Sequence, residues 1–151
     1  MTPLAASPDA ESFRYFVEES IQGIIIFDDV WGPMFANRAY AALFGYDNPS
    51  DILELESIAV LIAVEDRERM RSYRKLRMGG HKAPSRYDFV GIRRDGSRMT
   101  LEAIVTRVRW QDAFAIQTTV TDVTAARNVA REDAARQGRL AAQHQALLAI
   151  A

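Results

Sequence analysis

The sequence predicts an α+β domain with a helical tail, and three observations lead to this prediction. The hydrophobic patterns follow the order strand, strand, a run of helices and then three strands, which is the segregated order of α+β folds. Asp95-Gly96 is a strong hairpin signal between two of the later strands. The last residues are rich in alanine and contain no proline, which favours a helix. We therefore expect a flexible lead over residues 1–11, a domain over 12–124 and a helix over 125–151.

The first elements are an amphipathic helix and two strands. Four apolar residues recur at helical spacing and define one face of the helix: Phe13, Phe16, Val17 and Ile21. Gly23–Phe27 is apolar throughout and β-branched at its centre, which predicts a buried central strand. A second strand follows over residues 31–36, and Pro33 favours an edge position because proline cannot donate to a neighbouring strand.

Capping residues mark the short helices that come next. Asn37 suits the N-cap of a helix over residues 38–44, and Gly45 suits its stop. Ser50 is expected to cap a short helical piece over residues 51–55.

A longer helix is expected before the last three strands. Residues 56–64 are apolar and fit either a strand or a helix. Residues 65–78 predict a helix in which Glu65 and Arg69 form an i,i+4 pair and which Gly79-Gly80 ends.

The last third of the domain predicts a three-strand meander. Asp95-Gly96 forms its first turn and Gln111-Asp112 its second. In the last strand, Ile116, Thr118 and Val120 alternate with Gln117, Thr119 and Thr121, as in a sheet with one solvated face. The three strands are expected over residues 85–93, 99–110 and 113–123.

The tail resembles a weak coiled coil. Leu140 and Leu147 stand one heptad apart, but Asp133, Arg136 and Gly138 interrupt the seam. The helical pattern runs to Ala151 without a cap, so we expect the natural chain to continue beyond it.

Composition narrows the function classes. The net charge is -1 and arginines are scattered among acids, so we expect no nucleic-acid partner. The absence of cysteine excludes disulfides, thiolate metal sites and cysteine adducts. The first residues lack the basic and apolar regions of a signal peptide, and the longest apolar run, Gly23–Phe27, is far short of the roughly 20 residues that a membrane span needs. We expect a cytoplasmic protein without a span in this segment.

Four segments, in order, resemble the PAS domain family in its sensory-box form: Ile21–Asp28, Phe35–Tyr46, Arg93–Ser97 and Thr121–Thr124. They correspond to the family's opening strand, its "xxNxAxxxLxGY" segment, its "xKDGS" hairpin and its closing "DIT" motif, and the likeness extends over residues 13–124. This resemblance implies a five-stranded antiparallel sheet with helices on one face, which together enclose a cavity able to hold a small ligand.

The resemblance leaves the cofactor unknown. Members with covalent flavin need a cysteine that this chain lacks, and haem-binding members place an axial histidine on the helix before the third strand. Residues 65–78 contain no histidine, and His81 follows the Gly-Gly stop, so haem is not expected. We expect His81 and His144 to be exposed and to bind no metal, and no catalytic signature is present.

The residues expected to face the helices either fill the core or border a ligand pocket. Asn37, Tyr73 and Thr118 would be its polar groups. Trp31 and Trp110, near strand ends, are interpreted as packing or interface residues. The candidate pocket residues are Ile24, Ile26, Phe35, Asn37, Phe44, Met70, Tyr73, Phe89, Leu101, Ile116, Thr118 and Val120.

The start of the tail is the candidate signal relay. Asp122 or Thr124 would cap the helix. Asp122 would also form a charge-assisted bond with Arg94, our favoured partner, or with Arg93, and the family's motif has this coupling role.

These features predict a signalling module. The helix bearing Phe13, Phe16, Val17 and Ile21, with the solvated face of the sheet, would form a homodimer contact. The tail would pass a change to an output domain in the same chain, and in similar chains this is a histidine kinase or a diguanylate cyclase. The alternatives are a small-molecule or cofactor carrier without a relay role and, less favoured, a small enzyme.

Overall fold

The structure, a computed structural model, describes residue 16 and residues 20–150. Five strands form one antiparallel sheet in the order β2-β1-β5-β4-β3, which confirms the predicted fold class. The strands are β1 (Gly23–Phe27), β2 (Pro33–Ala36), β3 (Arg86–Ile92), β4 (Arg98–Trp110) and β5 (Ala113–Asp122). The helices are α2 (Arg38–Leu43), α3 (Pro49–Leu53), the 3₁₀ helix η1 (Ile58–Leu61), α4 (Val64–Met78) and α5 (Thr124–Ile150).

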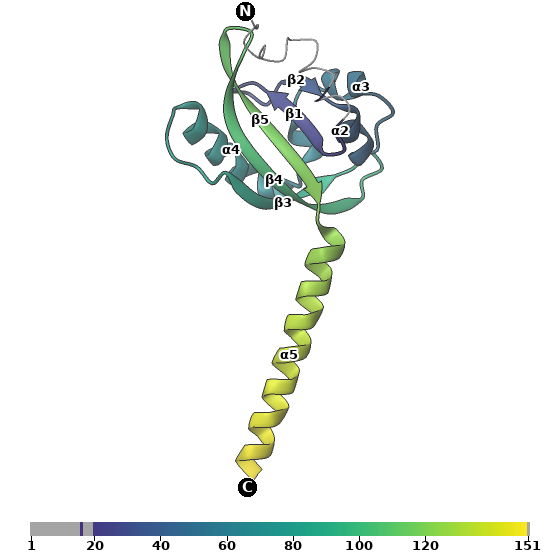
Figure 1. The fold of residues 1–151 in the computed structure, drawn as a ribbon, viewed down its shortest axis with the longest axis vertical. Helices are drawn as coiled ribbons and strands as arrows, with labels where there is room; N and C mark the ends of the chain where they lie inside the picture. The colour runs from purple at the N-terminus through teal and green to yellow at the C-terminus, as the bar shows by residue number, and fades with distance from the viewer. Residues whose placement is uncertain (1–15, 17–19, 151) are drawn as a thin grey trace, which may run out of the picture.

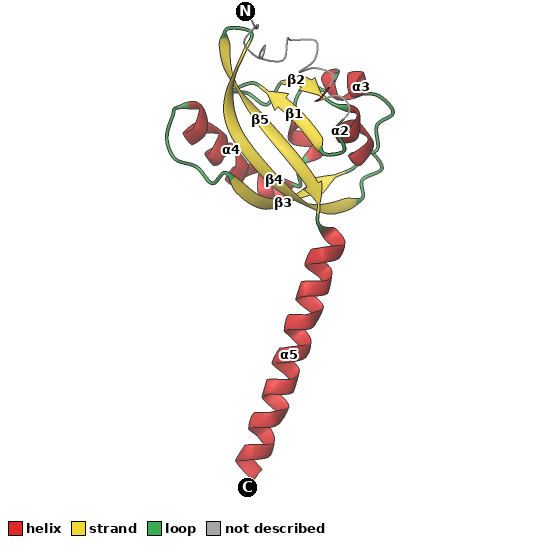
Figure 2. Ribbon diagram, viewed as in Figure 1, coloured by secondary structure: helices red, strands yellow, loops and turns green. Residues whose placement is uncertain are grey.

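The helices before β3 lie on one face of this sheet, and α5 leaves the sheet altogether (Figures 1 and 2). Strand β1 lies between β2 and β5, as the apolar sequence of Gly23–Phe27 predicts, and β2 is an edge strand, as Pro33 predicts. Of the expected N-terminal helix, only Phe16, Ser20 and Ile21 are among the described residues.

The second strand begins at Pro33 and not at Trp31, because a tight turn occupies the residues before it. Trp31 adopts a positive φ of 64°. The Asp28 carboxylate closes the turn by accepting from the N–H groups of Val30 (3.0 Å) and Gly32 (2.7 Å). An aspartate that bonds its own downstream backbone is a common way to stabilise such a turn.

Two further boundaries differ from the prediction. Helix α3 begins at Pro49 after Asn48, two residues earlier than a Ser50 cap would place it, because proline suits the first helical position. The N–H of Asn48 donates to the Asp51 carboxylate at 3.1 Å. The ambiguous segment 56–64 contains η1, which Ser57 caps.

Helix α4 lacks the predicted Glu65–Arg69 pair. Arg69 pairs instead with Asp66 at 3.3 Å, and Glu65 contacts Arg98 of β4. The Arg69 guanidinium lies over the rings of Tyr73 and Tyr87, so the side chain is directed toward the sheet and away from Glu65.

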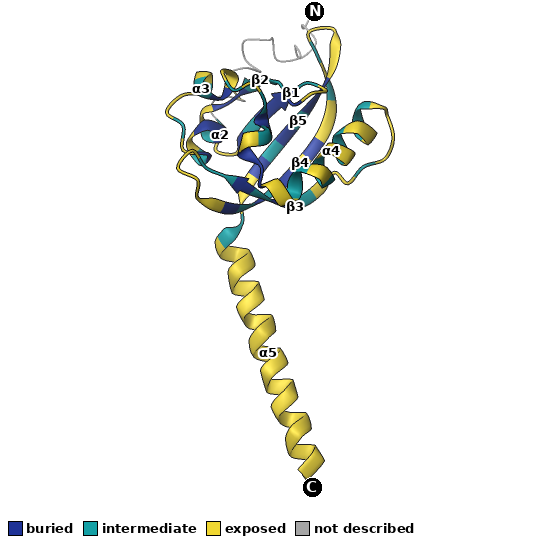
Figure 3. Cartoon of the chain, turned by 180° about the vertical axis from the view of Figure 1, so that it is seen from behind, coloured by how far each residue is buried: buried dark blue, intermediate teal, exposed yellow. Residues whose placement is uncertain are grey.

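Helix α5 projects from the end of β5 as a single rod (Figure 1). Its 27 residues span about 40 Å at 1.5 Å per residue. None of them is buried, and Figure 3 shows the helix exposed along almost its whole length. Among the described residues, no helix is long and apolar enough to cross a membrane.

Candidate functional site

A small cavity lies between the inner face of the sheet and the helices. Its volume of about 30 Å³ is enough for one or two water molecules. The interior in this conformation is therefore almost filled by side chains. The cavity is lined by Ile25, Phe27, Trp31, Tyr40, Phe44, Ile58, Leu61, Ile62, Met70, Tyr73, Arg74, Arg77, Tyr87, Phe89, Val105, Ile116, Thr118 and Val120.

The cavity brings together part of the predicted pocket and excludes the rest. The predicted residues that line it are Phe44, Met70, Tyr73, Phe89, Ile116, Thr118 and Val120. Those that do not are Ile24, Ile26, Phe35, Asn37 and Leu101.

Strand β1 was predicted with the wrong face toward the helices. Ile25 and Phe27 line the cavity, and Ile24 and Ile26 lie on the opposite face of the sheet. Side chains alternate along a strand, so a change of one position moves the whole set to the other face. The run Gly23–Phe27 is apolar on both faces and carries no signal that distinguishes them.

The other three excluded residues have packing or capping roles. Phe35 packs against Trp110, with ring centroids 5.9 Å apart. Leu101 is fully buried and lies so close to Gly91 that a Cβ on that glycine would stand 2.7 Å from its Cδ1.

Asn37 is fully buried and joins α2 to β1. Its Oδ1 accepts from the N–H groups of Ile24 and Tyr40, each at 2.9 Å, and its Nδ2 donates to the Gln22 carbonyl at 2.8 Å. The N-cap role was predicted, and the bonds to the first strand were not.

The sequence interpretation missed the basic wall of the cavity, which α4 supplies. Arg74 and Arg77 line the cavity, and the guanidinium groups of Arg71 and Arg74 lie 5.3 and 4.8 Å from the centroid of the buried Trp31 ring. Burial and the neighbouring Arg71 lower the pKa of Arg74 below its ordinary value. Arg71, Arg74 and Arg77 are each three residues apart, which places them on one face of the helix. This spacing is visible in the sequence, but the arginines were interpreted there only as scattered surface charges.

Two tyrosines complete this side of the cavity. Tyr73 and Tyr87 pack with ring centroids 4.9 Å apart. Burial raises the pKa of Tyr87 to about 12, so its phenol is neutral at physiological pH.

The junction between β5 and α5 is held by Asp122 and Thr124. Oδ1 of Asp122 accepts from the Thr124 N–H (2.9 Å) and hydroxyl (2.6 Å). The Thr124 hydroxyl oxygen accepts from the Thr100 N–H of β4 at 2.8 Å. The first residue of α5 is therefore bonded to both of the strands beside it.

Arg93, and not the favoured Arg94, pairs with Asp122. Arg93 Nη2 lies 3.5 Å from Asp122 Oδ2. The guanidinium of Arg94 lies 5.3 Å from the centroid of the Tyr46 ring, and its N–H donates to the Phe44 carbonyl. Arg93 directly follows β3, whereas Arg94 already lies in the turn and is directed toward Tyr46.

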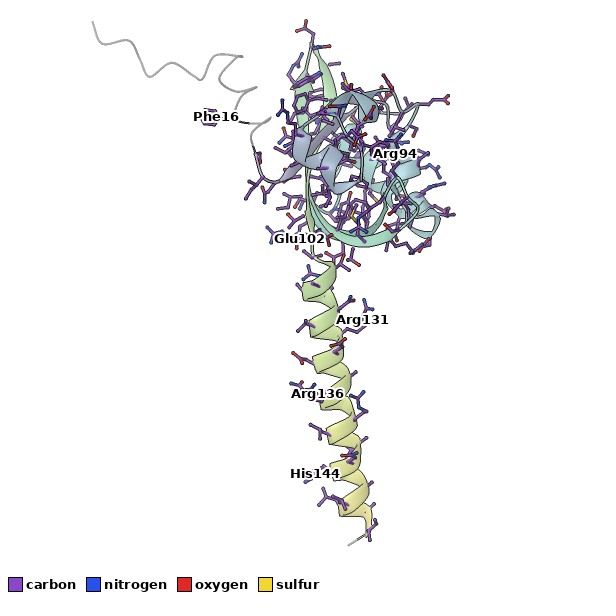
Figure 4. The ribbon with its side chains drawn as sticks, turned by 90° about the vertical axis from the view of Figure 1, so that its right-hand side faces the viewer. Phe16, Arg94, Glu102, Arg131, Arg136 and His144 are labelled. Carbon is purple, nitrogen blue, oxygen red and sulfur yellow. The ribbon has the colours of Figure 1, made fainter. Side chains whose placement is uncertain are left out.

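A second set of contacts at the junction was not predicted. Arg127, in the first turn of α5, donates to both carboxylate oxygens of Asp88 in β3, at 2.8 and 3.3 Å. It also donates to Glu102 of β4 at 3.1 Å, and Figure 4 shows Glu102 at the end of the domain from which α5 leaves. The hydrogen bond to Arg127 holds the pKa of Asp88 below its ordinary value. No local sequence pattern could predict that Arg127 pairs with Asp88 and Glu102, because these residues are far apart in the chain.

The two histidines lie on different parts of the chain. His81 is exposed, and Figure 4 shows His144 projecting from α5, far from the globular part. Among the described residues, no group of three or more histidine, aspartate or glutamate side chains could hold a metal ion.

Comparisons with known proteins agree with this architecture. Residues 11–77 match a model of the PAS domain. No curated protein matches the sequence.

Solved structures share the fold at low sequence identity. A PAS domain of an HTR-like protein from Haloarcula marismortui is 23% identical, with a TM-score of 0.61 over 74% of this chain and 89% of that chain. A sensory box histidine kinase/response regulator from Burkholderia thailandensis is 19% identical, with a TM-score of 0.60 over 87% and 98% of the two chains. The PAS domain of nitrogen regulation protein NR(II) from Vibrio parahaemolyticus is 18% identical, with a TM-score of 0.58 over 72% and 94%.

The matched segment covers β1 to α4, and the shared fold adds the three-strand meander that follows. Residues 11–77 therefore match the PAS domain family, the five-stranded sheet has the PAS fold, and the long helix α5 follows this sheet.

Proposed function

We propose that this PAS domain is a sensory module that relays a change in its sheet to an output domain through α5. The observation that carries the proposal is the junction, where α5 follows β5 after the single residue Val123. The N–H of Val123 donates to the Thr100 carbonyl at 2.9 Å, so even this residue is tied to the sheet. A rod joined to a strand without slack moves when the strand moves.

A chain of contacts connects the cavity wall to the same junction. Arg69 of α4, whose guanidinium lies over the cavity residues Tyr73 and Tyr87, donates to the Asp88 carbonyl at 2.9 Å. The Asp88 carboxylate in turn holds Arg127 of α5. A displacement of α4 therefore has a direct route to α5 through one residue of β3.

We also propose that the module works as a homodimer. Phe13 and Val17 of the expected contact lie outside the described residues. Phe16 is 67% and Ile21 97% exposed, which is the accessibility that a contact residue needs. Ile21 borders a groove of about 290 Å³ whose floor includes Leu43 and Val120.

The output domain is proposed to be a histidine kinase or a diguanylate cyclase in the same full-length chain. Several structures that share the fold are described as sensor histidine kinases, which supports the first of these. The second candidate function is a small-molecule carrier, for which the cavity of about 30 Å³ would have to expand around its ligand. Native mass spectrometry detects a bound ligand, and amide exchange with and without that ligand separates the two functions, because a carrier without a relay role would bind a ligand without changing the exchange of α5 amides.

The relay is tested by removing its two ionic contacts. We expect Asp122→Ala and Arg127→Ala to leave the domain folded and to speed amide exchange over residues 125–135 by about threefold or more, because each releases one tie at the root of α5.

Arg131→Ala is the matched control for these variants. Arg131 projects from α5 (Figure 4), and we expect no change in exchange when it is replaced. If all three variants exchange like the unaltered protein, the ionic contacts do not couple the sheet to α5.

A further inference from the structure

The charges around the cavity are all of one sign. Two of its lining residues, Arg74 and Arg77, are cationic, and none is an aspartate or a glutamate. Among the residues that the structure describes, no carboxylate lies within 4.0 Å of either guanidinium. Asp28 and Asp29 act on Arg74 only from a greater distance. The charge of a surface arginine is usually compensated by an ion pair with a carboxylate or by full hydration. Arg74 is partly buried and forms no ion pair within 4.0 Å with a carboxylate of the described residues, so its charge has neither form of compensation.

The rest of the lining is apolar and aromatic. Trp31, Phe27 and Phe89 face the cavity, and Thr118 is a buried polar residue on its strand side. An apolar chamber with two cations at one wall matches a molecule that has an apolar body and one anionic group. A neutral apolar molecule would add no charged partner to the two guanidinium groups, of which Arg77 already donates to the Pro84 carbonyl and Arg74 lies over the Trp31 ring.

We propose that this interior binds a small organic anion with an apolar body, whose charged group pairs with Arg74 and Arg77. The inference rests on the proposed function in one respect, namely that the interior is where the sensor takes its signal. It adds the chemical class of the ligand and the two residues that recognise it.

The present volume of about 30 Å³ requires part of α4 to move outward when such a ligand enters. Helix α4 has no fully buried residue, but Met70 and Met78 pack against the core, so an outward movement exposes apolar surface that the apolar body of the ligand would have to cover. Its first half is tied to β3 through Asp66, which accepts from the Val90 N–H at 2.7 Å, and through Arg69. Among the hydrogen bonds of the described residues, none joins its second half to β3: Arg77 donates to the Pro84 carbonyl in the loop before β3, and Arg107 of β4 donates to the Met78 carbonyl at 3.4 Å. The proposed opening is in this half, which carries Arg74 and Arg77.

The experiment compares octanoate with 1-octanol, which has the same apolar chain without the charge. Each is titrated into the full chain, and binding is followed by amide chemical shifts in two-dimensional NMR. We expect octanoate to bind saturably, more tightly than 1-octanol, with the largest shifts in residues that line the cavity. In the double variant Arg74→Met with Arg77→Met, octanoate should bind about tenfold more weakly or worse, as expected for the loss of a charge-assisted hydrogen bond, and 1-octanol should be unaffected.

Arg86→Met is the matched control, because Arg86 is an exposed arginine of β3 outside the cavity lining. Like each substitution in the double variant, it removes one positive charge. Unaltered octanoate binding in the double variant, equal binding of the two probes to the unaltered protein, or no saturable octanoate binding would each overturn the inference. So would an equal loss in Arg86→Met. The relay experiment uses ligand-free protein. A negative result in the binding experiment therefore leaves the proposed relay untouched, and a negative result in the relay experiment leaves the proposed ligand class untouched.

Discussion

At the scale of single residues, the most constrained side chain is Asn37. Its position was predicted from capping preference alone, but its three bonds also fix where β1 starts relative to α2. An N-cap preference is a local property and can be read from sequence. The bond to Ile24 joins residues 13 positions apart and depends on the folded chain.

Replacement of Asn37 by alanine should destabilise the domain by about 2–4 kcal/mol, because it removes the cap of the buried Tyr40 N–H and the part-buried bonds to the backbone of Ile24 and Gln22. Urea unfolding followed by circular dichroism measures the change. Asn48→Ala is the matched control, since Asn48 also precedes a helix but is exposed, and we expect it to cost less than about 1 kcal/mol. Equal losses in the two variants would contradict the role assigned to Asn37.

At the scale of elements, the informative relation is between β3 and α5. Arg127 joins them through Asp88, and this tie lies beside the one that the sequence motif predicts at Asp122. Two separate ties at the root of a helix restrict its rotation as well as its position. Strand β3 also carries Tyr87 and Phe89 of the cavity, so the same strand contacts the interior and the rod.

The Asp88–Arg127 contact should respond to acid with a defined sign. Arg127 stabilises the ionised carboxylate and lowers the pKa of Asp88, so the contribution of the pair is present above the ordinary aspartate pKa and is lost as pH falls through the lowered value. Side-chain carboxyl NMR titration should place the pKa of Asp88 below 3.8 in the unaltered protein and nearer 3.8 in Arg127→Gln. An unchanged pKa in that variant would show that the pair does not persist in solution.

At the scale of the whole molecule, the long helix α5 extends from the sheet-and-helix domain and, beyond its first turn, does not pack against it (Figure 3). Leu140, Leu147 and Ile150 are exposed along this rod, at 57%, 68% and 82%. An isolated helix buries no apolar surface, so the structure of α5 depends on helix propensity, on its junction and on any partner that it meets. The proposed dimer would bring two such rods together.

The double variant Phe13→Glu with Phe16→Glu should convert the proposed dimer to monomers, because charged side chains oppose burial at an apolar contact. Sedimentation velocity measures the oligomeric state. Phe114→Glu is the control, since Phe114 is 44% exposed on the hairpin between β4 and β5 and lies outside the proposed contact. A dimer that survives the double variant would place the contact elsewhere.

The order of the elements, the edge position of β2, the turn at Asp95-Gly96, the cap at Asn37 and the start of the tail could all be predicted from the amino-acid sequence. These features follow from backbone preferences and periodicities that act over a few residues, and such preferences survive in any fold that the chain could adopt. The folded structure was needed to establish which face of β1 meets the helices, which arginine reaches Asp122, and that Arg127 pairs with Asp88. Each of these depends on the register between segments far apart in the chain, and a strand that is apolar on both faces, or two adjacent arginines, cannot specify that register alone.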